Sequence, residues 1–95
     1  MPKVAVVMGS DSDLPVLEKA IDLLADFGIQ REVRVISAHR TPDAAAEFAK
    51  GAQRSGVEVI IAAAGKAAHL PGVLASMTTI PVIGVPVKSS FMDGL

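Results

Sequence analysis

The chain has 95 residues, a formal net charge of −1 and no cysteine, so it forms at most one domain and contains no disulfide or thiolate chemistry. The balanced charge, and three phenylalanines with no tyrosine or tryptophan, argue against a nucleic-acid-binding surface. No apolar run approaches the ~20 residues that a membrane span requires, and no signal-peptide pattern precedes the first predicted strand, so we expect a cytoplasmic protein without a membrane partner.

In chain order, the hydrophobic patterns predict a strand at residues 3–8, a helix at 14–27, a strand at 32–36, a helix at 43–55, a strand at 57–64, a short helix at 70–77 and a strand at 81–87. Strands that alternate with helices indicate parallel pairing with right-handed crossovers. We therefore expect a single domain over residues 1–95, a three-layer α/β fold with a parallel sheet of at least four strands in the order 2-1-3-4, as in flavodoxin-like and Rossmann-like folds. Most such folds continue with another strand and helix, so the chain looks truncated and its last strand would leave a hydrophobic edge.

Two of the helices have predicted inward faces. The stripe of the first consists of Leu17, Ala20, Ile21, Leu24 and Phe27, and that of the second of Ala45, Phe48, Ala49 and Ala52. Ser12 or Asp13 is placed to cap the first helix, and Thr41 and Pro42 to begin the second. Hydrophobic residues make up 51% of the chain, more than a small monomer easily buries, which predicts self-association.

Polar residues follow the predicted strands. They include Ser10, Ser12, Asp13, Ser37, His39, Arg40, Lys66 and His69. The carboxyl ends of parallel strands lie at one edge of a sheet, where open α/β sheets bind their ligands. We therefore expect these side chains to converge on one site.

The first of these loops, GSDSD at residues 9–13, suits a phosphate because it precedes a helix N-terminus. Gly9 allows close backbone approach, and Ser10 and Ser12 add hydroxyl donors. Asp13 would repel a phosphate and is better suited to accept hydrogen bonds from ribose hydroxyls. The alternative is that Ser12 and Asp13 only cap the helix.

The second loop, SAHRTP at residues 37–42, places Ser37, a histidine and an arginine directly before a helix. Arg40 offers a fork of donors for phosphate, and His39 is suited to move a proton near neutral pH. The alternatives are an exposed pair of Arg40 with Asp43 and an ordinary surface histidine.

The third loop, GKAAHLPG at residues 65–72, carries His69 between glycines that permit close approach to a ligand. The alternative is a partly buried histidine that bonds a backbone carbonyl. Two histidines and scattered acids lack metal-ligand spacing, so we predict no metal site.

Four segments together carry a family resemblance. GSDSD, SAHRTPD, AAHLPG and PVIGVPV, in this order and spacing, resemble the class I PurE family, the N5-carboxyaminoimidazole ribonucleotide mutases of purine biosynthesis. The resemblance covers essentially the whole chain, but only the N-terminal part of a usual member. It implies a homo-octamer of three-layer α/β domains. It also implies an isomerase that moves a carboxyl group from the exocyclic N5 to C4 of an aminoimidazole ribonucleotide, without metal, ATP or organic cofactor.

The resemblance further implies roles for individual residues. His39 would carry protons during decarboxylation and recarboxylation, and His69 would help to enclose the base and the carboxylate. The implied substrate-binding residues are Ser10, Ser12, Asp13, Ser37, Ala38, Arg40, Ala64, Gly65 and Leu70. Small residues, Ala63 among them, could wall a dry pocket that retains CO2.

One loop departs from the family pattern, because the usual AGAGGAAHLPG reads AAAGKAAHLPG here, with Ala63 and Lys66 in place of glycines. Lys66 could block the pocket, or it could add a cation for a carboxylate. Three alternatives therefore stay open: an AIR carboxylase that takes CO2 directly, a PurE-like carboxylase of cofactor biosynthesis, and a non-catalytic nucleotide-binding remnant.

Overall fold

The computed structural model describes residues 2–37, 41–64 and 69–87. Its sheet contains β1 (Lys3–Met8), β2 (Gln30–Val35), β3 (Val59–Ala64) and β4 (Val82–Pro86). All three strand pairs are parallel, and the order is β2-β1-β3-β4, which confirms the predicted topology. The helices are α1 (Leu14–Asp26), α2 (Pro42–Gly51) and α3 (His69–Ala75), with a short 3-10 turn, η1 (Asp11–Asp13), before α1.

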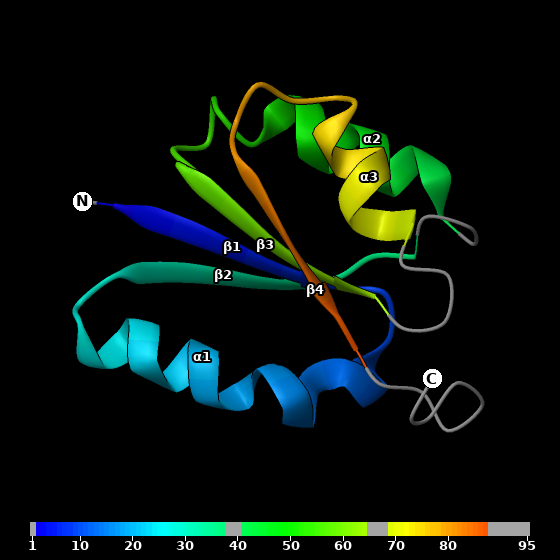
Figure 1. Cartoon of the computed structure of the whole chain (residues 1–95). Helices are drawn as coiled ribbons and strands as arrows, with labels where there is room; N and C mark the ends of the chain where they lie inside the picture. Colours follow the sequence, from blue (N-terminus) through cyan, green and yellow to red (C-terminus); the bar gives the residue numbers. More distant parts are fainter. Residues whose placement is uncertain (1, 38–40, 65–68, 88–95) are drawn as a thin grey trace.

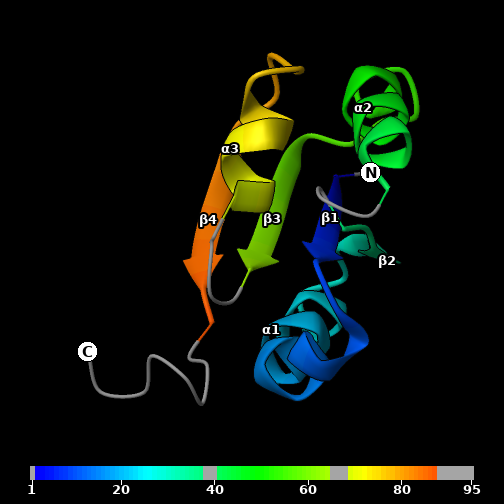
Figure 2. The same ribbon diagram turned by 90° about the vertical axis from the view of Figure 1, so that its right-hand side faces the viewer.

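The helices cover the two faces of the sheet unequally. α1 lies against one face, and α2 and α3 lie against the other (Figures 1 and 2). This arrangement gives the three layers that alternating strands and helices predict. No helix within the described ranges is long and apolar enough to cross a membrane.

Each face of the sheet has its own apolar core. Under α1, the buried residues are Val6, Met8, Leu17 and Ala63, with Ile21 and Leu24 packed against them. Under α2 and α3, the cluster includes Ala5, Val7, Ala45, Phe48, Ala49, Ile60, Ala62, Leu70 and Leu74. The alternation along β1 follows from the period of two in a strand, which sends successive side chains to opposite faces.

Gly84 in β4 allows α3 to approach the sheet closely. A Cβ atom added at Gly84 would lie 3.3 Å from Cβ of Pro71 in α3. This distance is tighter than most real Cβ contacts. The absence of a side chain at this position therefore sets how closely α3 packs on β4.

A small cluster of charged side chains links β1 and β2 on the side of the sheet that α2 covers. Nζ of Lys3 lies 3.1 Å from a Glu32 carboxylate oxygen and donates to the Ser55 carbonyl at 3.2 Å. Arg34 donates to the other Glu32 oxygen at 2.8 Å, and its guanidinium lies 5.6 Å from the centre of the Phe48 ring. The Lys3 hydrogen bond, more than the Arg34 hydrogen bond, lowers the pKa of Glu32 below its usual value, while partial burial opposes this shift.

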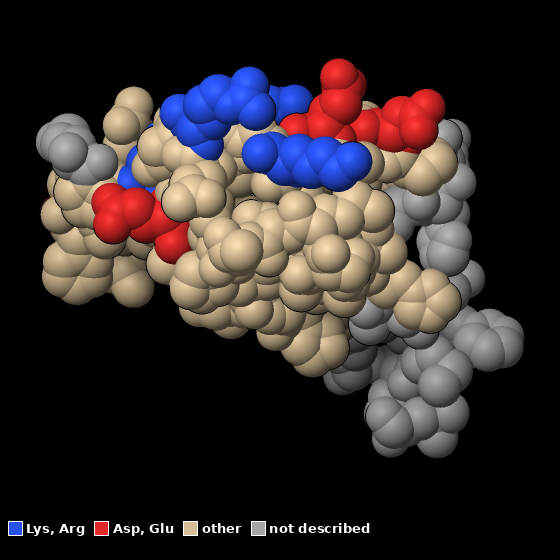
Figure 3. All heavy atoms as spheres, turned by 90° about the horizontal axis from the view of Figure 1, so that it is seen from above, with Lys and Arg blue, Asp and Glu red and all other residues tan. Residues whose placement is uncertain are grey.

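Charge on the α2 and α3 side is mixed. Basic and acidic side chains lie next to one another on this face, and the other described residues seen there are uncharged (Figure 3). Such a surface creates no large field of a single sign.

Several details of the predicted elements were wrong. Phe27 does not join the inward stripe of α1: it is the C-cap residue, and it is 72% exposed. α1 ends at Asp26, so Phe27 is no longer held against the sheet by the helix. α2 ends at Gly51 instead of residue 55, because residues 52–56 form turns that close at Gly56 with a φ of 92°. His69 begins α3 instead of ending a loop.

Candidate functional site

The carboxyl ends of β1, β2 and β3 are joined by backbone hydrogen bonds at one edge of the sheet. The Ile36 amide donates to the Met8 carbonyl at 2.8 Å, which ties the end of β2 to the end of β1. The Gly9 amide donates to the Ala63 carbonyl at 3.3 Å, which ties the first loop to β3. The carboxyl ends of these three strands therefore lie together at one end of the sheet, as parallel pairing predicts (Figure 2).

In the first loop, two serines form a compact turn. Ser10 is the N-cap of η1, and its Oγ accepts from the Ser12 amide at 3.2 Å. The two hydroxyl groups are 2.9 Å apart, and the Asp13 amide donates to the Ser10 carbonyl at 3.0 Å. Both serines are exposed. Their hydroxyl groups stand at the start of α1, where the helix dipole favours an anion.

Asp13 is the one buried polar or charged residue within the described residues, at 8% exposure. It occupies the N-cap position of α1, but its side chain accepts no capping hydrogen bond. Within the described ranges its carboxylate also forms no other hydrogen bond or ion pair. The capping role that the sequence left open is therefore absent, and the carboxylate oxygens keep their capacity to accept hydrogen bonds from a ligand.

Gly9 has no structural reason to be glycine within the described residues. Its φ is not positive, and an added Cβ atom would meet no other atom within 4 Å. Glycine is common where a backbone must come close to a ligand. The open space beside Gly9 is therefore consistent with a ligand that lies against the first loop.

In the second loop, a hydroxyl group ties the two described ends together. Oγ1 of Thr41 accepts from the Ser37 amide at 3.2 Å and donates to the Ser37 carbonyl at 2.9 Å. The three candidates between them, Ala38, His39 and Arg40, lie outside the described residues. The sequence predicted Thr41 as an N-cap residue, which its position confirms, but the helix receives no side-chain capping bond from it. The link back to Ser37 was missed, and only the i to i+4 spacing of a hydroxyl residue hinted at it.

The third strand end carries two candidates whose positions are described. His69 is exposed and begins α3, whereas the Leu70 side chain is 3% exposed and packs in the α2 and α3 core. Ala64 ends β3 in register with Pro86, while Gly65 and Lys66 lie outside the described residues. The neighbouring Ala63 is fully buried under α1, so its methyl group cannot wall a substrate pocket. The core under α1 accommodates the methyl group that Ala63 carries where the family pattern has a glycine.

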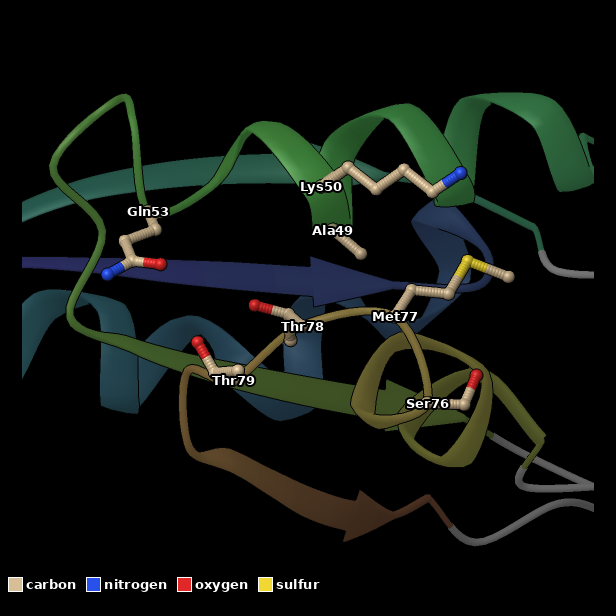
Figure 4. A pocket seen from close by; sticks show the side chains of 7 residues that line it. All are labelled: Ala49, Lys50, Gln53, Ser76, Met77, Thr78 and Thr79. Carbon is tan, nitrogen blue, oxygen red and sulfur yellow. The ribbon is translucent and has the colours of Figure 1, made fainter.

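A hollow of about 400 Å³ lies at the opposite end of the sheet, away from these loops (Figure 4). It is lined by Ala49, Lys50, Gln53, Ser76, Met77, Thr78 and Thr79. The Ser76 hydroxyl donates to the Val73 carbonyl at 2.7 Å, and Oγ1 of Thr78 accepts from the Ile80 amide at 3.2 Å. These hydroxyl groups form hydrogen bonds with the backbone of the turn before β4, so we assign them a structural role in that turn. Among the residues that the structure describes, no group of three or more acids and histidines is placed to hold a metal ion.

The fold and the geometry define an open parallel α/β domain with a candidate site for an anionic, hydroxyl-bearing ligand at the carboxyl ends of its strands. A family model described as AIR carboxylase matches residues 3–95. The chain belongs to this family, which confirms the resemblance drawn from its motifs.

Named relatives agree with this assignment. The chain is 60% identical over 95 residues to the N5-carboxyaminoimidazole ribonucleotide mutase of Thermotoga maritima. The alignment covers 100% of this chain and 56% of that protein. It is 55% identical over 94 residues to the phosphoribosylaminoimidazole carboxylase of Saccharomyces cerevisiae, of which it covers 16%. The structure of PurE from Treponema denticola superimposes with a TM-score of 0.84 at 29% identity, over 99% of this chain and 60% of that one. The chain thus spans little more than half the length of the mutases it matches.

Proposed function

We propose that the chain carries the nucleotide-binding and proton-transfer loops of an N5-carboxyaminoimidazole ribonucleotide mutase of purine biosynthesis, acting in the cytoplasm. The observation that carries this proposal is the 60% identity, over the entire chain, to a protein named as that mutase. The buried Asp13, which has no partner within the described residues, supports it independently, because a ribose-containing substrate offers hydroxyl groups to such a carboxylate.

The proposed substrate-binding roles rest on the resemblance to the family and, for Ser10, Ser12 and Asp13, on their described positions before α1. Asp13 would accept hydrogen bonds from the ribose hydroxyls, while Ser10 and Ser12 would donate to oxygen atoms of the substrate. Arg40 would bind the phosphate through charge-assisted hydrogen bonds. The remaining proposed contacts are those of Ser37, Ala38, Ala64, Gly65 and Leu70. Because the Leu70 side chain is buried in the core, its contribution would come from its backbone.

The proposed reaction moves a carboxyl group with one proton carrier. The N5–carboxyl bond breaks, CO2 is released, and the electron pair left on N5 takes a proton from the His39 imidazolium. C4 then attacks the carbon of CO2, a C–C bond forms, and C4 loses its proton to the neutral His39. The imidazolium is restored, so the cycle consumes no proton, and His69 would help to retain the base and CO2 in a site that excludes water.

The second candidate function is the AIR carboxylase reaction, in which CO2 comes from solution, and the relative named as a carboxylase in yeast favours it. A non-catalytic remnant would bind nucleotide without converting it. Calorimetry with aminoimidazole ribonucleotide, combined with a turnover assay, tests the proposal. We expect binding with conversion, and we expect Arg40→Ala to weaken binding about 10- to 150-fold by removing a charge-assisted bond. No binding by the parent chain would overturn the proposal, and binding without conversion would favour the remnant.

We also propose that the chain acts as a homo-oligomer, an octamer, with subunit contacts near α3 and the exposed edge of β4. Ile83 in β4 is 53% exposed, although it is a large apolar side chain in a strand. An uncovered apolar edge of this kind favours association. Light scattering at micromolar concentration should give about eight times the chain mass, and a stable monomer would contradict this.

A further inference from the structure

β2 forms one edge of the sheet, and β4 forms the other (Figure 2). At the start of β2, the Gln30 amide donates to the Pro2 carbonyl at 3.2 Å, so this residue turns its backbone groups toward β1. Because backbone groups alternate in direction along a strand, those of Arg31, Val33 and Val35 point to the free edge. No strand among the described residues pairs with them. An edge of this kind can pair with another chain.

The side chains of this edge differ between the two faces of the sheet. Val33 and Val35 are 41% and 55% exposed, and they lie on the face that α1 covers in part. Glu32 and Arg34 lie on the other face, where the Arg34 guanidinium is over the Phe48 ring. The edge therefore exposes apolar side chains on one face and two opposite charges on the other.

Two β2 strands in antiparallel orientation have one register that matches these side chains. With Val33 opposite Val33 of a second copy, Glu32 lies opposite Arg34 of that copy, and Arg34 lies opposite its Glu32. The two valines then exchange both backbone hydrogen bonds, because their backbone groups point to the free edge. The charged residues form the closer, non-hydrogen-bonded pairs. Opposite charges directly across an antiparallel pair stabilise it.

The neighbouring registers are unfavourable. A shift of two residues in one direction places Glu32 opposite Glu32 of the second copy, and a shift in the other direction places Arg34 opposite Arg34. Like charges directly opposite one another destabilise a strand pair. A shift of one residue would exchange the two faces and set each valine beside a charged residue. Charges often prevent pairing at an edge, but the order of signs in β2 selects one register instead.

The space beside the charged face leaves room for the side chains of a second copy. A hollow of about 340 Å³ lies between β2 and α2, and Glu32, Arg34 and Glu47 are among the residues that line it. A second Arg34 that enters from the edge would meet the carboxylates of both Glu32 and Glu47. The shape and the charge of this edge therefore both suit a second copy.

We propose that β2 is a self-association surface, at which two copies of the chain pair their β2 strands antiparallel about a twofold axis with Val33 opposite Val33. The two sheets then form one continuous sheet, and the contact is isologous, as in most twofold oligomers. The proposal rests on the self-association proposed above but not on catalysis, and it concerns the edge of the sheet opposite β4.

The experiment reverses single charges in the intact chain. Arg34→Glu sets carboxylates opposite one another in the pair, and Glu32→Arg sets guanidinium groups opposite one another. Each variant alone should lose the pairing, so its mass in light scattering should fall to about half that of the parent. An equimolar mixture of the two variants should recover the parental mass, because each negative edge then meets a positive one. Asp22→Arg is the matched control, since Asp22 is exposed on α1, and it should keep the parental mass.

A second readout uses the parent chain and covers the case in which a variant fails to fold. The Val33 amide, which points to the free edge, should exchange its hydrogen about as slowly as the Arg34 amide, which faces β1. Rapid exchange at Val33 would overturn the β2 interface, as would parental mass in both charge variants. No recovery in the mixture, or an equal loss in Asp22→Arg, would also overturn it. A monomeric parent would overturn both this interface and the proposed octamer, whereas rapid Val33 exchange in an octameric parent would overturn this interface alone.

Discussion

Replacing Asp13 with asparagine should separate ligand binding from stability. The Asp13 residue is 8% exposed, and its carboxylate makes no capping bond and has no ion-pair partner among the described residues. If it were a structural group, its removal would destabilise the fold. If it is held for a ligand hydroxyl, its removal should weaken binding and leave the fold nearly as stable.

The two effects differ in size. Asparagine loses the favourable interaction of a negative charge with the N-terminus of α1, which is worth about 0.3–1 kcal/mol. The net change in the free energy of unfolding should therefore be within about 1 kcal/mol. Hydrogen bonds to charged groups are worth about 1.5–3 kcal/mol, so the dissociation constant for the ribonucleotide should rise about 10- to 150-fold.

Calorimetry of aminoimidazole ribonucleotide binding, paired with thermal unfolding, measures both quantities. Asp11→Asn is the control, because Asp11 lies in the same 3-10 turn and is exposed, so it changes the net charge equally. We expect Asp11→Asn to bind like the parent. An unchanged dissociation constant in Asp13→Asn, together with a large loss of stability, would refute the reasoning and return Asp13 to a structural role.

Three further predictions concern other parts of the chain. The pKa of Glu32 is lowered mainly by its hydrogen bond from Lys3. The ionised carboxylate therefore stabilises the fold at pH values above its usual pKa of 4.5, and this stabilisation is lost as the pH falls through the lowered pKa. Glu32→Gln should reduce stability near neutral pH by less than about 1 kcal/mol and flatten the acid limb of a Tm-against-pH curve. Gly84→Val should destabilise the fold by about 1–3 kcal/mol in chemical denaturation, because its side chain would meet Pro71, whose Cβ lies 3.3 Å from an added Cβ. His39→Asn should keep much of the binding and lose about 10²–10⁴-fold in turnover, and a loss of only a few-fold would remove the proton-transfer role.

The sequence predicted the topology well, because strict alternation of strands and helices leaves few arrangements of a parallel sheet. The short β-branched run of β1 and the apolar spacing of Ala45, Phe48 and Ala49 were sufficient to assign buried faces, and these were confirmed. Phe27 was misplaced because periodicity alone ignores where a helix ends. A residue beyond the last turn is no longer held against the sheet.

The candidate site was predictable as an edge of the sheet, but not in its hydrogen bonding. Parallel strands place the loops after β1, β2 and β3 together whatever their sequence. The pattern could not tell whether Asp13 caps α1, because capping and ligand-binding aspartates occupy the same position. It also could not show that Thr41 turns back to Ser37, since a threonine before a proline normally suggests a helix cap.

Our central proposal is that the chain transfers a carboxyl group within one ribonucleotide. It is tested most directly with N5-carboxyaminoimidazole ribonucleotide that carries ¹³C in its carboxyl group, in the presence of unlabelled bicarbonate. We expect ¹³C NMR to show the label on the C4 carboxylate of the product, because the CO2 released from N5 stays in the site. A C4 carboxylate without label would mean that CO2 comes from solution, and the absence of a C4-carboxylated product would contradict catalysis by this chain.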